Sequence, residues 1–305
     1  MARCIAAKHK MTENLWSVVL AAGQGRRLSP VTRGIPKQFW SANGGCSLLD
    51  ETRERLAALV PPERTTVVVG QEHQRYLRSA RCPWTTEWLV YQPRDRGTAT
   101  GALLALLPVL VRAPNAIVLM TPSDHGMAEP ATFHATVQEV VGDVMSRRLD
   151  VVLFGAEPTR PATDYGWITP GAVCPWRHDR RLRRVAGFAE KPAADVAHRL
   201  FARGAVWNTM VVVARLSVLL GLYLRHLPHL TATLVPCASL SGTSCRRVLA
   251  KAYERLSSAD FCRDLLASAE DLAMYSWPAS IGWSDLGTPE RLQAWLAADA
   301  RARVA

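Results

Sequence analysis

Short apolar runs alternate along most of the chain with longer segments whose apolar residues recur at helical spacing. The first run, residues 16–20, contains the β-branched pair Val18-Val19 and is followed by glycines, which favours a strand over a helix. The other predicted strands are residues 65–69, 87–91, 116–120, 151–155 and 185–189. The predicted helices are residues 46–59, 73–80, 98–111, 127–145, 216–227, 244–256 and 289–298.

The predicted strands are near-continuous apolar runs, and helices separate most of them. Strands that are apolar on both faces are typical of a parallel sheet covered by helices on both sides. We therefore expect a single α/β domain with a Rossmann-like sheet that is mixed but mainly parallel. Ligands of such sheets bind at the carboxyl ends of the strands, so the loops that follow the strands are the candidates for chemistry.

Length and composition set limits on this interpretation. At 305 residues the chain is long enough for one large domain with a substantial core. We expect residues 1–13 to be a disordered extension, in which Met11 is an alternative start. No apolar run is long enough to span a membrane, so we expect no membrane partner. The seven scattered cysteines contain no C-x-x-C pair, which argues against a zinc site or disulfide framework and favours a cytoplasmic location.

The formal net charge of +11 first suggests nucleic acid as a partner. The arginines are spread along the chain, and their densest run, residues 177–184, lies between two strand-like segments, where we expect a solvated hairpin or loop. No aromatic residue interleaves with this run, as happens in proteins that bind single strands. Positive potential also attracts small phosphorylated ligands, and we expect these in place of nucleic acid.

The stretch after the first strand carries the strongest chemical signal. Gly23 and Gly25 lack a Cβ, so backbone N–H groups in this turn can approach an anion closely. Two arginines follow, and seven residues separate Leu28 from Pro36-Lys37. Leu28 occupies the place of the third glycine in the dinucleotide pattern G-x-G-x-x-G, and the Gly-Lys-Ser/Thr of a P-loop is missing. The arrangement suits a triphosphate.

The whole spacing, L-x-x-G-x-G-x-R-L followed by seven residues and P-K, resembles the signature of the sugar-1-phosphate nucleotidyltransferases. The ending at residues 36–39, P-K-Q-F, is similar to the mannose-1-phosphate guanylyltransferase branch of that family. The resemblance assigns nucleotide binding here to Ala22, Gly23, Gly25 and Arg27. It also implies that Arg27 holds the β- and γ-phosphates, and that Lys37 bridges the α-phosphate and the incoming sugar phosphate.

The loop after the third predicted strand, residues 92–99, reads Q-P-R-D-R-G-T-A. We expect Thr98 to be the N-cap of the helix that follows. The loop also resembles the guanylyltransferase stretch Q-P-x-N-R-G-T-A, with Asp95 in place of Asn. Gln92 offers an acceptor and donors to a base edge, and the N–H groups of Gly97 and Thr98 lie at a helix N-terminus. The resemblance therefore assigns nucleotide binding to Gln92, Gly97 and Thr98.

Two aspartates are candidates for a metal site. Asp124 follows the fourth predicted strand, where a carboxylate is as often the N-cap of the next helix as a ligand. Residues 122–125 resemble the motif P-x-D-H, whose Asp binds magnesium, and Asp285 lies in a W-x-D-x-G element as the second carboxylate. Hard oxygen ligands beside a triphosphate suit Mg²⁺. The resemblance thus implies Mg²⁺ as the cofactor and adds Asp124 to the catalytic residues Arg27 and Lys37.

Three later stretches resemble the sugar-binding motifs of the same family. Residues 158–168 are similar to P-T-x-P-x-T-x-Y-G-Y-I, residues 190–192 to E-K-P, and residues 207–210 to W-N-S-G. Met210 stands where a glycine is usual, which is a departure from the pattern. The resemblance assigns the sugar phosphate to Tyr165, Gly166, Glu190, Lys191 and Asn208.

The resemblance covers residues 15–295 and implies one nucleotidyltransferase domain over residues 14–298. Residues 14–150 form its nucleotide-binding half, and residues 151–298 its sugar-phosphate-binding half. We expect neither the C-terminal β-helix nor the cupin-like module of longer relatives. The implied reaction converts GTP and mannose 1-phosphate into GDP-mannose and pyrophosphate. A homo-oligomer is left open.

Two alternatives stay beside this hypothesis. One is a related enzyme that joins glucose 1-phosphate to UTP or dTTP, because the choice of base rests on few contacts. The other is a non-catalytic homologue that only binds a nucleotide-sugar. Such a protein is expected to lose its charged catalytic residues, and this chain keeps them.

Overall fold

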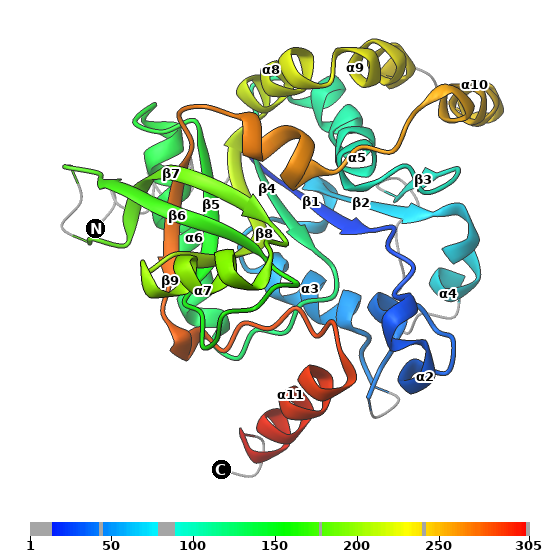
Figure 1. The fold of residues 1–305 in the computed structure, drawn as a ribbon. Helices are drawn as coiled ribbons and strands as arrows, with labels where there is room; N and C mark the ends of the chain where they lie inside the picture. Colours follow the sequence, from blue (N-terminus) through cyan, green and yellow to red (C-terminus); the bar gives the residue numbers. More distant parts are fainter. Residues whose placement is uncertain (1–13, 43–44, 79–88, 177–178, 240–241, 303–305) are drawn as a thin grey trace, which may run out of the picture.

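The computed structural model describes residues 14–42, 45–78, 89–176, 179–239 and 242–302. The extension expected at residues 1–13 lies outside the described residues. The core is a nine-stranded sheet with the strand order β3-β2-β1-β4-β8-β5-β9-β7-β6. The sheet runs through the middle of the molecule and has helices on both sides (Figure 1). The predicted α/β architecture is confirmed.

The first four strands form the parallel part of the sheet. β1 pairs in parallel with β2 and with β4, and β2 pairs in parallel with β3. Their bounds are Leu15–Ala21 (β1), Thr65–Gly70 (β2), Leu89–Gln92 (β3) and Ile117–Pro122 (β4). All four were predicted, although residues 87–88 of the third prediction lie outside the described part of the chain. These strands were recognisable because helices cover both of their faces, which makes each run apolar throughout.

The remaining strands make the sheet mixed. Their bounds are Val151–Ala156 (β5), Gly166–Val173 (β6), Leu182–Glu190 (β7), Val206–Arg215 (β8) and Ala273–Trp277 (β9). β8 is antiparallel to β4, β5 and β6, and β7 is antiparallel to β6 and β9, whereas β5 and β9 are parallel. Of the described strands, β7 and β8 therefore point against the others, and the sheet is mainly parallel in direction.

The pairing of β6 with β8 closes part of this sheet on itself. β8 pairs with β5 and with β6, while β5, β9, β7 and β6 are successive neighbours, so β5 to β9 form a ring of strands. The ring depends on Gly155 of β5, because a Cβ at that position would lie 2.2 Å from Cγ2 of Val206 on β8. Figure 1 shows the long β6–β7 hairpin on the side of the molecule away from β1 to β3.

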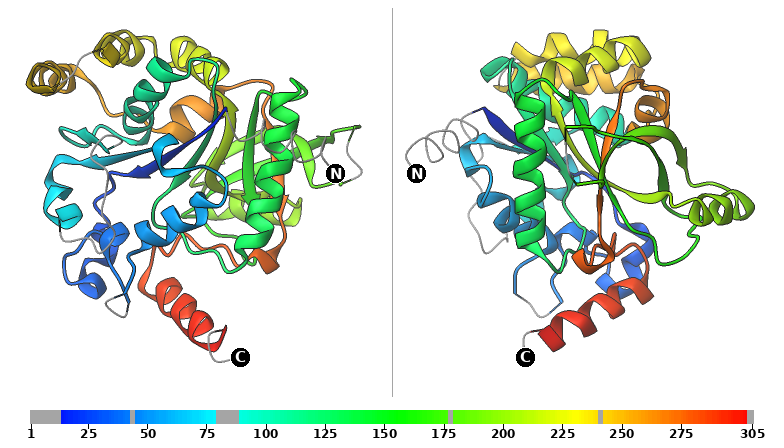
Figure 2. Two further views of the ribbon diagram at one scale, coloured as in Figure 1. Left: turned by 180° about the vertical axis from the view of Figure 1, so that it is seen from behind. Right: turned by 90° about the vertical axis from the view of Figure 1, so that its left-hand side faces the viewer.

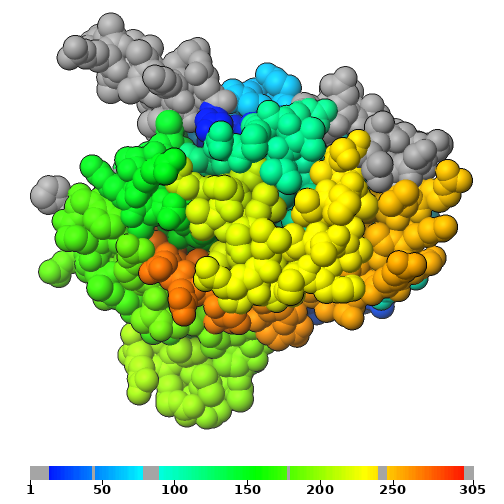
Figure 3. Space-filling model, turned by 90° about the horizontal axis from the view of Figure 1, so that it is seen from above, coloured from blue at the N-terminus to red at the C-terminus, as the bar shows by residue number. Residues whose placement is uncertain are grey.

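Helices cover both faces of the sheet. Their bounds are Ser29–Thr32 (α2), Leu48–Ala57 (α3), Gln74–Arg78 (α4), Thr98–Arg112 (α5), Pro130–Met145 (α6), Ala194–Ala202 (α7), Leu216–His226 (α8), Pro228–Leu234 (α9), Gly242–Arg255 (α10) and Pro289–Ala302 (α11). α3 and α6 share one buried cluster with the sheet, and α5 shares the other with α8, α9 and α10. Figure 2 shows α6 upright against its face, and Figure 3 shows α8 to α10 covering the other.

Several elements differ from the sequence prediction. The strands β6, β8 and β9 and the helices α7 and α9 were not predicted as such. α6 begins at Pro130 and not at residue 127, with Glu129 as its N-cap. In the arginine run 177–184, residues 177–178 lie outside the described residues, and Leu182 already begins β7. Within the described residues, no helix combines the length and apolar character needed to cross a membrane.

Candidate active site

The glycine-rich turn after β1 packs directly on the segment that carries Lys37. Gly25 has φ +61°, and a Cβ there would lie 2.8 Å from Lys37 N, so only glycine permits this approach. Gln38 is buried, and its Nε2 donates to Ala21 O at 2.9 Å and to Gly23 O at 2.7 Å. Sequence reasoning missed Gln38 as a site residue, although it directly follows Lys37. Its amide holds the turn in place.

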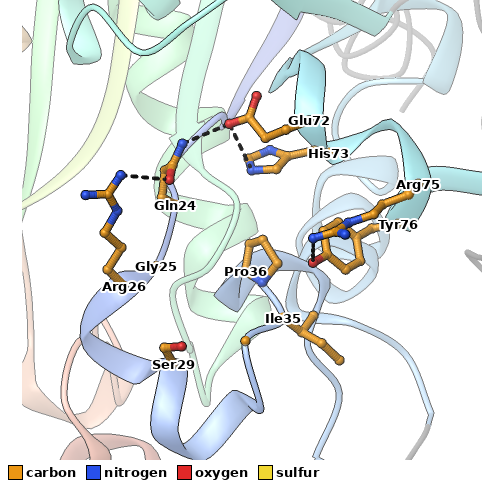
Figure 4. A pocket seen from close by; sticks show the side chains of 11 residues that line it. Gln24, Gly25, Arg26, Ser29, Ile35, Pro36, Glu72, His73, Arg75 and Tyr76 are labelled. Carbon is orange, nitrogen blue, oxygen red and sulfur yellow. Dashed lines mark hydrogen bonds and ion pairs between the residues drawn. The ribbon is translucent and has the colours of Figure 1, made fainter.

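The outer side of this turn borders a polar pocket of about 230 Å³ (Figure 4). Gln24 Nε2 donates to Glu72 Oε1 at 2.9 Å, and Arg26 Nη2 donates to Gln24 Oε1 at 3.2 Å. Glu72 lies in the turn after β2, so these bonds join the loops that follow β1 and β2. Gly25 and Arg26 line this outer pocket. Arg27 is exposed and lines neither this pocket nor the central one described next.

A central pocket of about 360 Å³ opens at the carboxyl ends of β1, β3 and β4, where the sequence analysis expected the ligand. Six of the predicted site residues line it, namely Ala22, Gly23, Gln92, Gly97, Thr98 and Asp124. Among its other lining residues are several that the sequence analysis did not assign: Gln38, Asp95, Ser123, His125, Met210 and Asp260. The structure therefore gathers into one pocket loops that follow three different strands.

Gln92 presents an unused hydrogen-bond acceptor in this pocket. Its side chain is buried, and no described group bonds its Oε1. A Cβ at Gly101 of α5 would lie 2.9 Å from that oxygen, so glycine at this position makes room for the amide. A buried acceptor without a partner costs free energy. A ligand that brings an N–H to Gln92 would remove that cost.

The loop between β3 and α5 is held from the far end of the chain. Thr98 Oγ1 accepts from Phe261 N at 2.8 Å and donates to Asp260 Oδ2 at 3.3 Å. Asp260 is the N-cap of a short π-helical turn, Phe261–Leu265. The prediction that Thr98 is the N-cap of α5 was wrong: Gly97 takes that place, and Thr98 is the first helical residue. The N–H of Gly97 already donates to Asp95 Oδ1 at 2.8 Å.

Gly97→Ala is expected to destabilise the protein by about 2–4 kcal/mol. Gly97 has φ +85° and ψ 167°, a conformation that essentially only glycine adopts, and a Cβ there would lie 2.2 Å from Ala259 O. Gly142→Ala on α6 is a matched control, because a Cβ at Gly142 meets nothing within 4 Å and alanine favours a helix. Urea unfolding measures both variants. Equal stabilities for the two would contradict this account of the loop.

Lys37 brings together the two predicted metal ligands. Lys37 is 5% exposed, its Nζ lies 3.0 Å from Asp124 Oδ2, and it also donates to the backbone oxygen of Asp285. The alternative interpretation of Asp124 as a helix cap was wrong, because α6 begins at Pro130 and is capped by Glu129. Asp124 is therefore free of any capping role and faces the central pocket.

The charge on Asp124 is set by its neighbours. Burial alone would raise the pKa of the Asp124 carboxyl, but neighbouring groups, chiefly the charge of Lys37 and its hydrogen bond, outweigh it and lower that pKa. Burial also lowers the pKa of His125 to about 4, so its imidazole is neutral at pH 7. In agreement, His125 Nδ1 accepts from Trp283 Nε1 at 3.3 Å. The site thus presents an ionised Asp124 whose close positive partner is Lys37.

Asp285 is more fully occupied than Asp124. Its Oδ1 accepts from Tyr165 OH at 2.8 Å and from Gly287 N at 3.1 Å, and it lies 3.0 Å from Arg291 Nε on α11. Arg291 also donates to Asp164 Oδ2 at 2.7 Å. Burial, followed by the neighbouring Asp285, raises the pKa of the Tyr165 hydroxyl well above its ordinary value. In this structure Tyr165 is therefore a donor to Asp285.

The donor set fits a hard cation such as Mg²⁺ at Asp124 and, after a change of partner, at Asp285. Asp124 is an ionised carboxylate in the pocket wall, as such an ion requires. Asp285 would have to exchange Arg291 for the ion. Within the described residues there is no group of three or more acidic, histidine or cysteine ligands. Such a site suits an ion that takes its other ligands from phosphates and water.

The residues predicted to bind the sugar phosphate lie at the start of β6, at the end of β7 and near the start of β8. Gly166 of β6 is paired with Glu190 of β7, and a Cβ at Gly166 would lie 2.6 Å from Glu190 Oε2 and 3.4 Å from Asn208 Cβ. Lys191 Nζ lies 3.0 Å from Glu190 Oε1. These residues do not line the central pocket. Met210 lines it instead and lies two residues beyond Asn208 on β8.

Asn208 is held by protein partners at both ends of its amide. Its Oδ1 accepts from Met210 N at 3.1 Å, and its Nδ2 donates to the sulfur of Cys262 at 3.2 Å. Cys262 lies in the π-helical turn and also contacts the sulfur of Met210. Met210 has φ +60°, the left-handed region that glycine favours. This explains in physical terms why the family pattern has a glycine there.

The comparisons with known proteins support one family. The family model described as "Nucleotidyl transferase" matches residues 16–301. The chain is 27% identical over 280 residues to the mannose-1-phosphate guanylyltransferase of Escherichia coli K12. This alignment covers 90% of this chain and 58% of that protein. The chain is 29% identical over 292 residues to the mannose-1-phosphate guanylyltransferase RfbM of Salmonella typhimurium, with 89% and 56% covered. The chain thus spans little more than half the length of these relatives.

A solved structure agrees with the sequence relatives. The crystal structure described as mannose-1-phosphate geranyltransferase from Thermus thermophilus superposes with a TM-score of 0.75 at 28% identity, over 90% of this chain and 76% of that one. The family match over nearly all of the chain, together with the glycine-rich turn and the pocket at the strand ends, shows that the chain belongs to the nucleotidyl transferase family.

Proposed function

We propose that this protein transfers the guanylyl group of GTP to mannose 1-phosphate and so forms GDP-mannose and pyrophosphate. The observation that carries the proposal is the place of Lys37 and Asp124. Lys37 packs against Gly25 of the glycine-rich turn and donates to the backbone oxygen of Asp285. Its Nζ lies 3.0 Å from Asp124 Oδ2, and Asp124 lines the same pocket as Gln92. The mannose-1-phosphate guanylyltransferases among the relatives favour this pair of substrates over the others that the family uses.

The reaction is an in-line displacement at phosphorus. An oxygen of the sugar phosphate forms a bond to the α-phosphorus of GTP, and the bond from the α-phosphorus to the pyrophosphate oxygen breaks. A phosphate dianion is already a nucleophile at neutral pH, so no general base is needed. The protein contributes position and positive charge. Lys37 neutralises charge on the α-phosphate and the sugar phosphate, and the turn at residues 23–25 binds the β- and γ-phosphates through its N–H groups.

Gln92 and the sugar residues would give the site its specificity. The unused Oε1 of Gln92 suits the N–H donors of a guanine base, and uracil and thymine offer fewer of them. Glu190 would bridge sugar hydroxyls, and Lys191 would meet the sugar phosphate. Mg²⁺, held by Asp124 and Asp285, would supply further positive charge to the phosphates. A cytoplasmic location stays a prediction from the sequence, and a homo-oligomer stays open.

The test is pyrophosphate release from each pairing of GTP, UTP and dTTP with mannose 1-phosphate and glucose 1-phosphate. GTP with mannose 1-phosphate is expected to react fastest. The two sugars differ only at the 2-hydroxyl, so a preference for glucose 1-phosphate would change the sugar and keep the reaction. No release from any pairing, together with binding of GDP-mannose, would favour the non-catalytic alternative.

Asn208→Ala is expected to raise the KM for mannose 1-phosphate about tenfold or more, with little change in the KM for GTP. A buried polar contact to a hydroxyl is worth about 1–3 kcal/mol when its partner is left unpaired. Cys262→Ala is the matched control, because it removes the protein partner of Asn208 Nδ2 and leaves the amide in place. If both variants change the two KM values alike, Asn208 supports β8 and does not read the sugar.

A further inference from the structure

A third pocket lies beside strands of the ring and has a volume of about 460 Å³. Its walls come from β6, β7, β8 and β9, from the loop after β5 and from the end of α7. None of the residues assigned above to GTP, to the sugar phosphate or to the metal lines it. It is therefore separate from the candidate active site, and we call it the basic pocket because of its charge.

Three arginines of the run at residues 177–184 line the basic pocket. Arg183 Nε donates to Gly171 O at 2.8 Å, which fixes the guanidinium and leaves its terminal N–H groups for a ligand. Arg180 is exposed and forms no hydrogen bond or ion pair with the described residues. Arg181 is the third. Among the described residues that line the pocket, Glu157 is the one carboxylate, and its Oε2 already accepts from Ala279 N at 3.2 Å.

An apolar surface completes the basic pocket. Phe201, at the end of α7, is 39% exposed and lines the pocket together with Pro158 and Pro170. The planar guanidinium group of an arginine presents a fork of N–H donors that suits phosphate. An exposed aromatic ring suits the apolar part of a small molecule. A volume of about 460 Å³ lies in the range of pockets for small organic ligands and far exceeds what an inorganic phosphate fills.

We propose that the basic pocket binds a small phosphorylated organic molecule as a ligand distinct from the substrates. Its arginines meet the phosphate, and Phe201 packs against the organic part. Two segments of the chain also connect the pocket to the predicted sugar site. Val206 in its wall precedes Trp207-Asn208 on β8, and Pro158 begins the segment that leads to Tyr165. Occupancy is thus expected to change the kinetics for the sugar phosphate more than those for GTP.

Calorimetric titration with inorganic phosphate, glucose 6-phosphate and AMP tests the proposal, and it does not depend on the identity of the substrates. Arg180→Gln is expected to weaken binding of the organic phosphates about tenfold to a hundredfold. Arg180 is exposed and forms no hydrogen bond or ion pair with the described residues, so the variant is expected to fold normally. Arg225→Gln, at an exposed arginine of α8 outside the pocket, is the matched control and should bind as the parent does.

The three probes distinguish the sources of the phosphate. Glucose 6-phosphate or AMP should bind more tightly than inorganic phosphate, and Phe201→Ala should reduce that advantage. Equal affinity for all three probes would overturn the organic ligand and leave a site for free phosphate. Binding that Arg180→Gln and Arg225→Gln weaken to the same extent, or no binding by the parent protein, would overturn the site itself.

Discussion

Lys37→Ala is expected to lower kcat by about a hundredfold to a thousandfold while the KM for GTP changes far less. The charge of Lys37 meets the α-phosphate and the sugar phosphate mainly as they react. Its loss therefore raises the barrier of the chemical step by about 3–4 kcal/mol without an equal loss of GTP binding. Initial rates of pyrophosphate release, measured over a range of GTP concentrations, give both constants.

A structural role for Lys37 must be separated from this chemical one. Lys37 is almost fully buried and holds the ionised Asp124, so its removal leaves that carboxylate without its close partner. Lys37→Met keeps an apolar stem of similar length, and the double variant with Asp124→Asn removes both charges. We expect the double variant to recover stability in urea unfolding and to stay inactive. A Lys37→Met enzyme with near-normal kcat would reduce Lys37 to a counter-ion of Asp124.

The parallel half of the fold and its loops could be predicted from local sequence. Each of its strands is apolar on both faces, and the ligand loops follow directly at the strand ends. The rule that ligands bind at the carboxyl ends of the strands predicted that Gln92 and Asp124 lie near one ligand, and both line the central pocket. In contrast, Arg27 belongs to the same motif and does not line the central pocket. The motif alone therefore does not predict where the side chain of Arg27 lies.

The second half was harder because its pairings are distant in sequence. β8 was missed because the buried polar pair Asn208-Thr209 interrupts its apolar run. The hydroxyl of Thr209 is satisfied inside the sheet, where its Oγ1 donates to Phe154 O on β5. β9 is a single short run whose place between β5 and β7 depends on strands that lie some 90 to 120 residues away in the sequence. No local pattern specifies such a closure.

The contact between Thr98 and Asp260 shows the same limit. The two residues are 162 positions apart, yet their bond fixes the loop that carries Gly97. Asp260 had a local signal, since an aspartate before a helical turn is a good N-cap, but nothing in that signal tied it to the nucleotide loop. Met210 was noticed only as a departure from a family pattern. Its positive φ, which the sequence does not state, explains that pattern.

Asp124→Asn and Asp285→Asn are each expected to reduce magnesium-dependent activity by at least about a hundredfold without unfolding the protein. Each change replaces a carboxylate by a neutral amide of the same shape, so the ion loses a charged hard ligand beside several phosphates. Asparagine at position 285 can still accept from Tyr165 OH and Gly287 N, which protects the local structure. The measurement is activity as a function of Mg²⁺ concentration, with urea unfolding alongside.

Asp164→Asn is the matched control for Asp285→Asn. Asp164 also binds Arg291, but among the described residues no hydrogen bond or ion pair joins it to Lys37, whereas Asp285 accepts from Lys37 through its backbone oxygen. Burial would raise the pKa of Asp164, and the hydrogen bond and charge of Arg291 outweigh it and keep that pKa low. If the effect of Asp285→Asn came only from releasing Arg291, Asp164→Asn should reproduce much of it with an unchanged Mg²⁺ requirement. If Asp285 binds the ion, Asp164→Asn should leave the Mg²⁺ curve close to that of the parent. An unchanged curve for Asp124→Asn would contradict the role of Asp124 as a metal ligand. A capping role would not account for that result, because Asp124 does not cap α6.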